Sequence, residues 1–180
     1  MHSDLIGKIE KARHYAQEPE RVEVQLLHAV FRGSNNEHQI TLEGGQWVCD
    51  CTAFRTHSTC AHVMSLQKIL APMLDTAARE DVRLGLQSDT VSMIEKSRHY
   101  AHEPERLQIT AWRAVFRGSN NDHTLTLADD VWACDCTTFR LHGTCAHVMA
   151  AQKILAPMLS EAALRTVGGI TPAMIASTLS

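Results

Sequence analysis

Six cysteines and two of the histidines are spaced as two equal sets of metal ligands. Each set has the order cysteine, one residue, cysteine, eight residues, cysteine, one residue, histidine. The sets are Cys49, Cys51, Cys60 and His62, and Cys134, Cys136, Cys145 and His147. Zinc favours four ligands in a tetrahedron, with thiolate sulfur at about 2.3 Å and imidazole nitrogen at roughly 2.0–2.1 Å. The spacing therefore predicts two Zn²⁺ ions per chain.

A set of four protein ligands closes the coordination shell and leaves no position for a reactive water. We therefore expect both ions to be structural, with no catalytic residue, no further cofactor and no small-molecule substrate. His57 and His142 stay open as alternative ligands, because each lies three residues before a cysteine of its set.

Three other interpretations of the cysteines are weaker. Inert burial does not explain two identical spacings that each end in a histidine. Disulfides are rare in a reducing compartment. A cysteine nucleophile served by His57 or His62 would be neutralised by the metal, and the sequence offers no oxyanion site.

The chain is an internal duplication. Adding 85 to a residue number carries every ligand of the first set onto one of the second, and 44 of 66 positions match between residues 9–74 and 94–159. We expect one unit over residues 3–87, a second over 88–172 and a short tail over 173–180. A recent duplication keeps both copies alike whatever their role, so the identity locates the unit without selecting functional residues.

Hydrophobic periodicity predicts an α+β fold in which each unit is a helix, a three-stranded antiparallel meander and a closing helix. In the first unit these elements are a helix over 5–16 that stops before Pro19, strands over 22–31, 38–42 and 47–49, and a helix over 60–70. Strict alternation along the first strand places Val22, Val24, Leu26, His28 and Val30 on one face. Ser58 or Thr59 is expected to cap the closing helix, and Pro72 to end it.

The cysteine and histidine pattern resembles the SWIM-type zinc finger. The resemblance covers the 14-residue ligand segment of each unit and extends to its surroundings, namely Trp47 or Trp132, Phe54 or Phe139, and Val63 or Val148. It implies that the eight residues above are the zinc ligands. Proteins with this finger bind nucleic acid or other proteins, so the resemblance implies an interaction module.

Charge favours a protein partner, with DNA binding by the tandem fingers as the alternative. The net charge is −3, and three thiolates around a divalent ion add about −1 per site. Affinity for phosphate backbones needs dense Lys and Arg, which the chain lacks. A basic face remains an alternative to a mixed solvated surface. Its members would be Arg32, Arg55, Lys68, Arg117, Arg140 and Lys153.

The remaining aromatic and histidine residues are expected to be structural. Trp47, Trp112 and Trp132 are predicted core residues. His14, Tyr15 and His38 are predicted to lie on a helix surface or a strand face. No run of about 18 apolar residues is present, and the first residues lack the features of a secretory signal. We therefore expect a cytoplasmic protein with no membrane contact.

Overall fold

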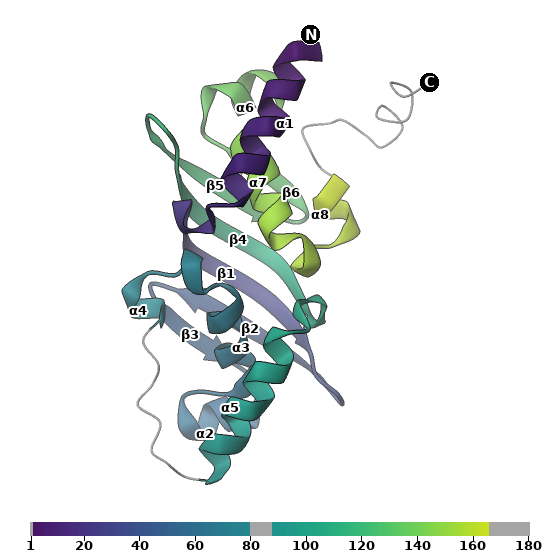
Figure 1. Cartoon of the computed structure of the whole chain (residues 1–180). Coiled ribbons are helices and arrows are strands. Elements are labelled where there is room, and N and C mark those ends of the chain that lie inside the picture. Colours follow the sequence, from purple (N-terminus) through teal and green to yellow (C-terminus); the bar gives the residue numbers. More distant parts are fainter. Residues whose placement is uncertain (1, 80–87, 166–180) are drawn as a thin grey trace.

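The two halves of the chain contain the same elements in the same order (Figure 1). The structure is a computed structural model, and it describes residues 2–79 and 88–165. The first half contains α1 (His2–Ala16), the 3-10 helix η1 (Pro19–Arg21), β1 (Val22–Arg32), β2 (Glu37–Glu43), β3 (Gln46–Cys49), α2 (Thr52–His57), α3 (Ala61–Ile69), η2 (Ala71–Met73) and α4 (Thr76–Arg79). The second contains α5 (Ser88–Ala101), η3 (Pro104–Arg106), β4 (Leu107–Arg117), β5 (Asp122–Ala128), β6 (Val131–Cys134), α6 (Thr137–His142), α7 (Ala146–Leu155), η4 (Ala156–Met158) and α8 (Glu161–Arg165).

The strands of both halves form a single antiparallel sheet in the order β3-β2-β1-β4-β5-β6. At its centre, Leu27 of β1 pairs with Trp112 of β4, and Trp112 is the residue that the offset of 85 makes equivalent to Leu27. The other pairs follow in mirrored order, from Val22 with Phe116 to Phe31 with Leu107. A pseudo-two-fold axis therefore passes between Leu27 and Trp112.

One residue of each central strand is left out of the ladder. Gln25 of β1 and its equivalent Thr110 of β4 are the skipped positions. Such a bulge reverses the faces of the residues that follow. The buried residues of β1 are accordingly Val22, Val24, Leu27, Ala29 and Phe31.

The prediction that Leu26, His28 and Val30 share the face of Val22 and Val24 is therefore wrong, because strict alternation cannot cross a bulge. The alternation predicted for the second strand holds, since Ile40 and Leu42 are both buried.

The long helices are exchanged between the halves. Helix α1 packs against α7 of the second half, and α5 packs against α3 of the first half (Figure 1). The cause is the direction of the central strands. Because β1 begins opposite the end of β4, the helix that leads into β1 lies over the second half of the sheet.

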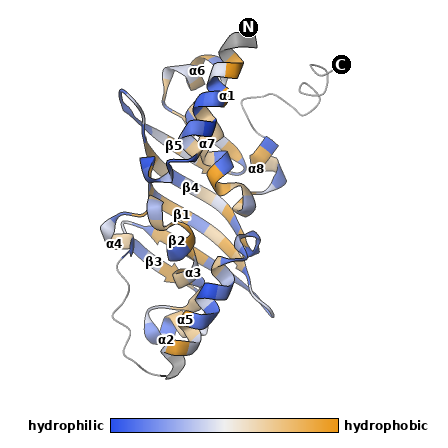
Figure 2. Ribbon diagram, in the orientation of Figure 1, coloured by the Kyte–Doolittle hydropathy of each residue, from blue (hydrophilic) through white to orange (hydrophobic). Residues whose placement is uncertain are grey.

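One hydrophobic core joins the two halves beneath these helices. Figure 2 shows hydrophobic and hydrophilic residues alternating along the central strands, which is typical of a sheet covered on one face. Trp112 and Trp132 are buried in the core, where their rings meet edge to face at 5.6 Å. Trp47 is partly buried and donates its indole N–H to the Ala78 carbonyl at 2.9 Å. The prediction that the tryptophans are core residues is confirmed for Trp112 and Trp132, whereas Trp47 packs at the edge of the core.

The local elements agree with the expected α+β class and add detail. The first helix ends at Ala16, and Pro72 lies in η2 directly after the closing helix. That helix is capped by Cys60, so the prediction of a Ser58 or Thr59 cap is wrong. The short helices α2 and α6 were not expected. The predicted unit ends near residues 87 and 172, and the tail over 173–180, lie outside the described residues.

Candidate metal centres

The structure brings together both sets of cysteines and histidines named by their spacing. Within each set the four ligand atoms lie within 4.8 Å of one another. His62 Nδ1 is 3.8 Å from both Cys49 Sγ and Cys60 Sγ, and His147 Nδ1 is 3.9 Å from Cys134 Sγ. Ligands of a tetrahedral zinc ion are separated by roughly 3.5–3.8 Å. Each set is therefore close to the size that such an ion requires.

The alternative histidines do not join these clusters. His57 and His142 end the short helices α2 and α6, and both are exposed. The geometry therefore selects His62 and His147. His38 also stays outside the first cluster, as expected for a residue of a strand face.

Three local elements position the ligands of the first centre. Cys49 ends β3, Cys51 caps α2, and Cys60 caps α3, whose first turn carries His62. The Cys51 sulfur accepts a hydrogen bond from the amide of Phe54 at 3.4 Å. These caps place sulfur where the helix dipole and free amides favour negative charge, so each is suited to a thiolate.

The second centre repeats this arrangement. The sulfur of Cys136 accepts from the amide of Phe139 at 3.3 Å, and that of Cys145 accepts from the amide of Val148 at 3.5 Å. The cysteines that bind the metal are thus also the residues that begin the helices.

The pKa values of the cysteine thiols indicate that a metal ion must displace protons when it binds. The Cys60 thiol hydrogen-bonds Cys49, which lowers the pKa of Cys49 to about 4 and raises that of Cys60. Burial raises the pKa of Cys51 and of Cys136, while hydrogen bonding and then burial raise that of Cys134. Most of the sulfurs therefore hold their protons in the absence of a metal, and binding a cation must release them.

The ligand histidine of each centre lies among aromatic rings. The His62 ring is 4.6 Å from Phe31, 4.6 Å from His38 and 5.8 Å from Tyr100, measured between ring centroids. Tyr100 belongs to α5, so it reaches this centre from the other half of the chain. In the second centre the rings around His147 are Phe116 at 4.9 Å, His123 at 4.6 Å and Tyr15 at 5.7 Å.

A second histidine lies beside the ligand histidine of each centre, and an aspartate holds it. This aspartate stands between the first two cysteines of the set. His38 Nδ1 lies 3.0 Å from Asp50, and His123 Nδ1 lies 3.1 Å from Asp135. Burial opposes ionisation of Asp135, but the amide of Thr124 and the His123 ring outweigh it and lower its pKa. This pair fixes the orientation of the ring that stacks on the metal ligand, the role of an outer shell in a metal site.

Sequence reasoning did not find this outer shell. The tyrosines, Phe31 and Phe116 carry no spacing signal, because they meet the ligands only through the folded sheet. The prediction that Tyr15 lies on the helix surface is wrong, because its side chain is buried. The one available signal was the aspartate between two ligand cysteines in both sets.

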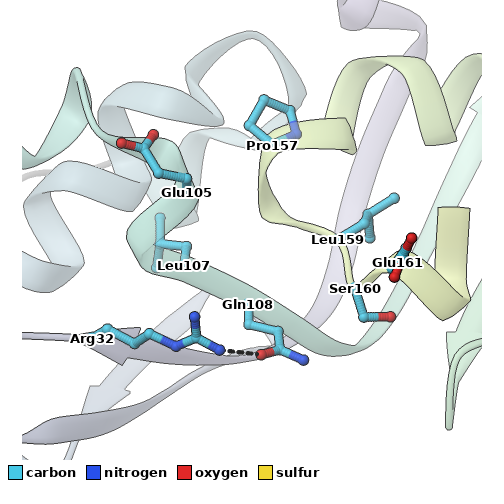
Figure 3. A pocket seen from close by; sticks show the side chains of 8 residues that line it. All are labelled: Arg32, Glu105, Leu107, Gln108, Pro157, Leu159, Ser160 and Glu161. Atoms are coloured by element: carbon cyan, nitrogen blue, oxygen red, sulfur yellow. Dashed lines mark hydrogen bonds between the residues drawn. The ribbon is translucent and has the colours of Figure 1, made fainter.

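The surface has two hollows to consider, and one of them lies beside a metal centre. One, of about 260 Å³, lies beside the second centre and is lined by Cys136 and His147 together with Lys11 and Tyr15. The other, of about 330 Å³, lies between the halves, where Arg32 donates to Gln108 at 2.9 Å (Figure 3). None of its lining residues belongs to a cysteine cluster.

Comparisons of the chain with protein-family models, with curated proteins and with solved structures give no match. The two cysteine and histidine clusters, each able to hold a metal ion, therefore carry the functional argument by themselves.

Proposed function

We propose that the chain is a non-catalytic interaction module that binds two zinc ions and, through its folded surface, a protein partner. The single observation that carries the proposal is the closed set of three sulfurs and one nitrogen in each centre. Such a set supplies all four ligands of Zn²⁺ and favours a structural role. The resemblance to SWIM-type fingers belongs to the same proposal.

The uncovered face of the sheet is the surface that we assign to the partner. One row across all six strands joins Val48, Thr41, His28, Ala111, Ala128 and Val131. Val48 and Val131, at its two ends, are 55% and 58% exposed. The row is largely uncharged, and exposed β-branched and small side chains of this kind suit contact with a protein surface.

The charges argue against a phosphate backbone as the ligand. Arg117 forms an ion pair with Glu23 at 2.7 Å, and Arg32 lies 3.7 Å from Glu37. Two members of the basic face considered above are therefore partly neutralised. Binding of DNA remains the competing function because the net charge is only mildly negative.

The same proposal includes a cytoplasmic location. Six thiols are kept reduced and available for zinc in the cytoplasm. In the part of the chain that the structure describes, none of the helices has the length and apolar character needed to cross a bilayer.

The metal is tested on full-length protein purified without added zinc. We expect about two zinc ions per chain by elemental analysis, and thiols that react only after chelation. Protein that is folded, free of metal and fully reactive toward thiol reagents would contradict the proposal.

The partner class is tested in two ways. Labelled DNA and RNA titrated across salt should show no saturable binding, whereas binding that weakens steeply with salt would support the DNA alternative. A photo-cross-linking residue at Val48 should give a discrete protein adduct that excess unlabelled chain competes away. The matched control places the same residue at Leu141, an exposed position on α6, and should give none.

A further inference from the structure

The exchange of α1 and α5 gives each metal centre a residue from the opposite half of the chain. Tyr100 of the second half stacks on His62 of the first, with an angle of 19° between the rings. Tyr15 of the first half stacks on His147 of the second at 17°. Both tyrosines are buried, at 7% and 2% exposure. Neither ligand histidine is therefore enclosed by its own half alone.

Each tyrosine also packs on a phenylalanine of the half that it covers. The ring of Tyr100 is 4.8 Å from Phe31, and that of Tyr15 is 5.1 Å from Phe116. The tyrosine and phenylalanine rings meet the imidazole from different directions, so they restrict its rotation. The tyrosine thus acts on the metal through the orientation of a ligand.

An arginine after each exchanged helix anchors the tyrosine. The guanidinium of Arg106 lies 5.7 Å from the Tyr100 ring and donates to the carbonyl of Arg32 at 3.3 Å. Arg21 repeats this, at 5.4 Å from Tyr15 and 3.2 Å from the carbonyl of Arg117. Each arginine therefore ties the exchanged helix to the end of a strand in the opposite half.

We propose that Tyr100 and Tyr15 are positioning residues, each for the metal centre of the opposite half. The inference rests on zinc binding as proposed above.

Cadmium-113 NMR of the full-length chain tests this inference, since each centre should give one resonance. Cys49→Ser and Cys134→Ser assign the two resonances by removing one each. In Tyr100→Leu we expect the first-centre resonance to shift and its metal to exchange about tenfold faster, the effect of losing two aromatic contacts. The second-centre resonance should stay in place. Tyr100→Phe, which keeps the ring, should restore both the shift and the exchange rate.

The control variant is Val91→Ala, an exposed position on the same helix, which should change neither resonance. Arg106→Gln gives a milder test should Tyr100→Leu not fold. It should speed exchange at the first centre by about threefold through loss of the arginine–ring contact. Tyr15→Leu should act on the second centre alone.

A change confined to the second centre in Tyr100→Leu would overturn the inference, because it would show that each tyrosine serves its own half. Equal changes at both centres, or no change at either, would overturn it as well. Failure of the proposed function looks different, since the unmodified chain would then give no bound-cadmium resonances at all.

Discussion

The two halves of the chain use different residues where the backbone adopts left-handed conformations. The turn from β2 to β3 uses Gly44 and Gly45 at φ of 56° and 77°, whereas the turn from β5 to β6 uses Asp129 and Asp130 at 48° and 64°. The short helix α2 is followed by Ser58 in a left-handed conformation, and the equivalent helix α6 is followed by Gly143. The metal centres, in contrast, have the same ligands and the same ring contacts. One backbone thus accepts different residues at its turns while the set of ligand residues is unchanged.

The two halves also differ at the pseudo-two-fold axis between β1 and β4. Leu27 and Trp112 occupy equivalent positions and face each other, so the core is filled by unlike residues at its centre. The indole N–H of Trp112 is buried and without a hydrogen-bond partner among the described residues. The second half therefore places a larger side chain at this site than the first, at some cost in polar desolvation.

The largest expected effect comes from removing one ligand in either half. Cys60→Ser and Cys145→Ser should each reduce bound zinc to about one ion per chain. Structural zinc contributes about 10–16 kcal/mol of apparent binding energy, so each variant should be several kcal/mol less stable. Elemental analysis and chemical denaturation measure the two quantities.

The two ligand variants also test whether the halves unfold together. Because the halves share one core and one sheet, we expect the whole chain to lose stability in both variants, and to a similar extent. Two unfolding transitions, with the unaltered half melting as in the native chain, would contradict this.

An intermediate effect is expected at the axis. Trp112→Leu should cost about 2 kcal/mol through the cavity that it leaves, and Leu27→Trp about 1–3 kcal/mol through overpacking. The double exchange Leu27→Trp with Trp112→Leu restores the total volume across the axis. It should therefore be less destabilised than the sum of the two single variants.

Denaturant unfolding of the four proteins gives the coupling energy directly. Additive effects would show that the side chains at these two positions do not share one packing site. Leu26→Ala, on the uncovered face of β1, serves as the control and should not couple to Trp112→Leu.

The smallest effect is expected at the end of the short helices. Ser58 has a φ of 55°, and its equivalent Gly143 has a φ of 65°. A non-glycine residue in this region costs about 1 kcal/mol. Ser58→Gly should therefore stabilise the chain by up to that amount, and Gly143→Ser should destabilise it similarly. Thermal unfolding of the two variants checks the opposite signs, and equal signs would show that the two caps are not comparable.

Much of the local structure could be predicted from the residues. The ligand sets follow from spacing alone, and the ends of the first helix and of the closing helix follow from Pro19 and Pro72. The face of the first strand could not be predicted beyond Val24, because nothing at Gln25 marks a bulge. The cap at Cys60 was missed because a cysteine was assigned to the metal and not also to the helix.

The exchange of helices lay beyond local sequence signals altogether. It follows from the antiparallel pairing of β1 with β4, which is a long-range contact between residues about 80 positions apart. For the same reason Tyr15 and Tyr100 could not be assigned to a centre. The unit ends and the tail after residue 172 stay predictions.

The exchange of helices also sets an order of events during synthesis. Helix α1 is made first, but α7, the helix on which it packs, is made more than 100 residues later. Until then the Tyr15 side of α1 is exposed on the nascent chain, and the second centre cannot close. Long-range contacts of this kind form slowly and leave apolar surface open to aggregation. The fold around the second centre is therefore incomplete on the nascent chain until α7 has been synthesised.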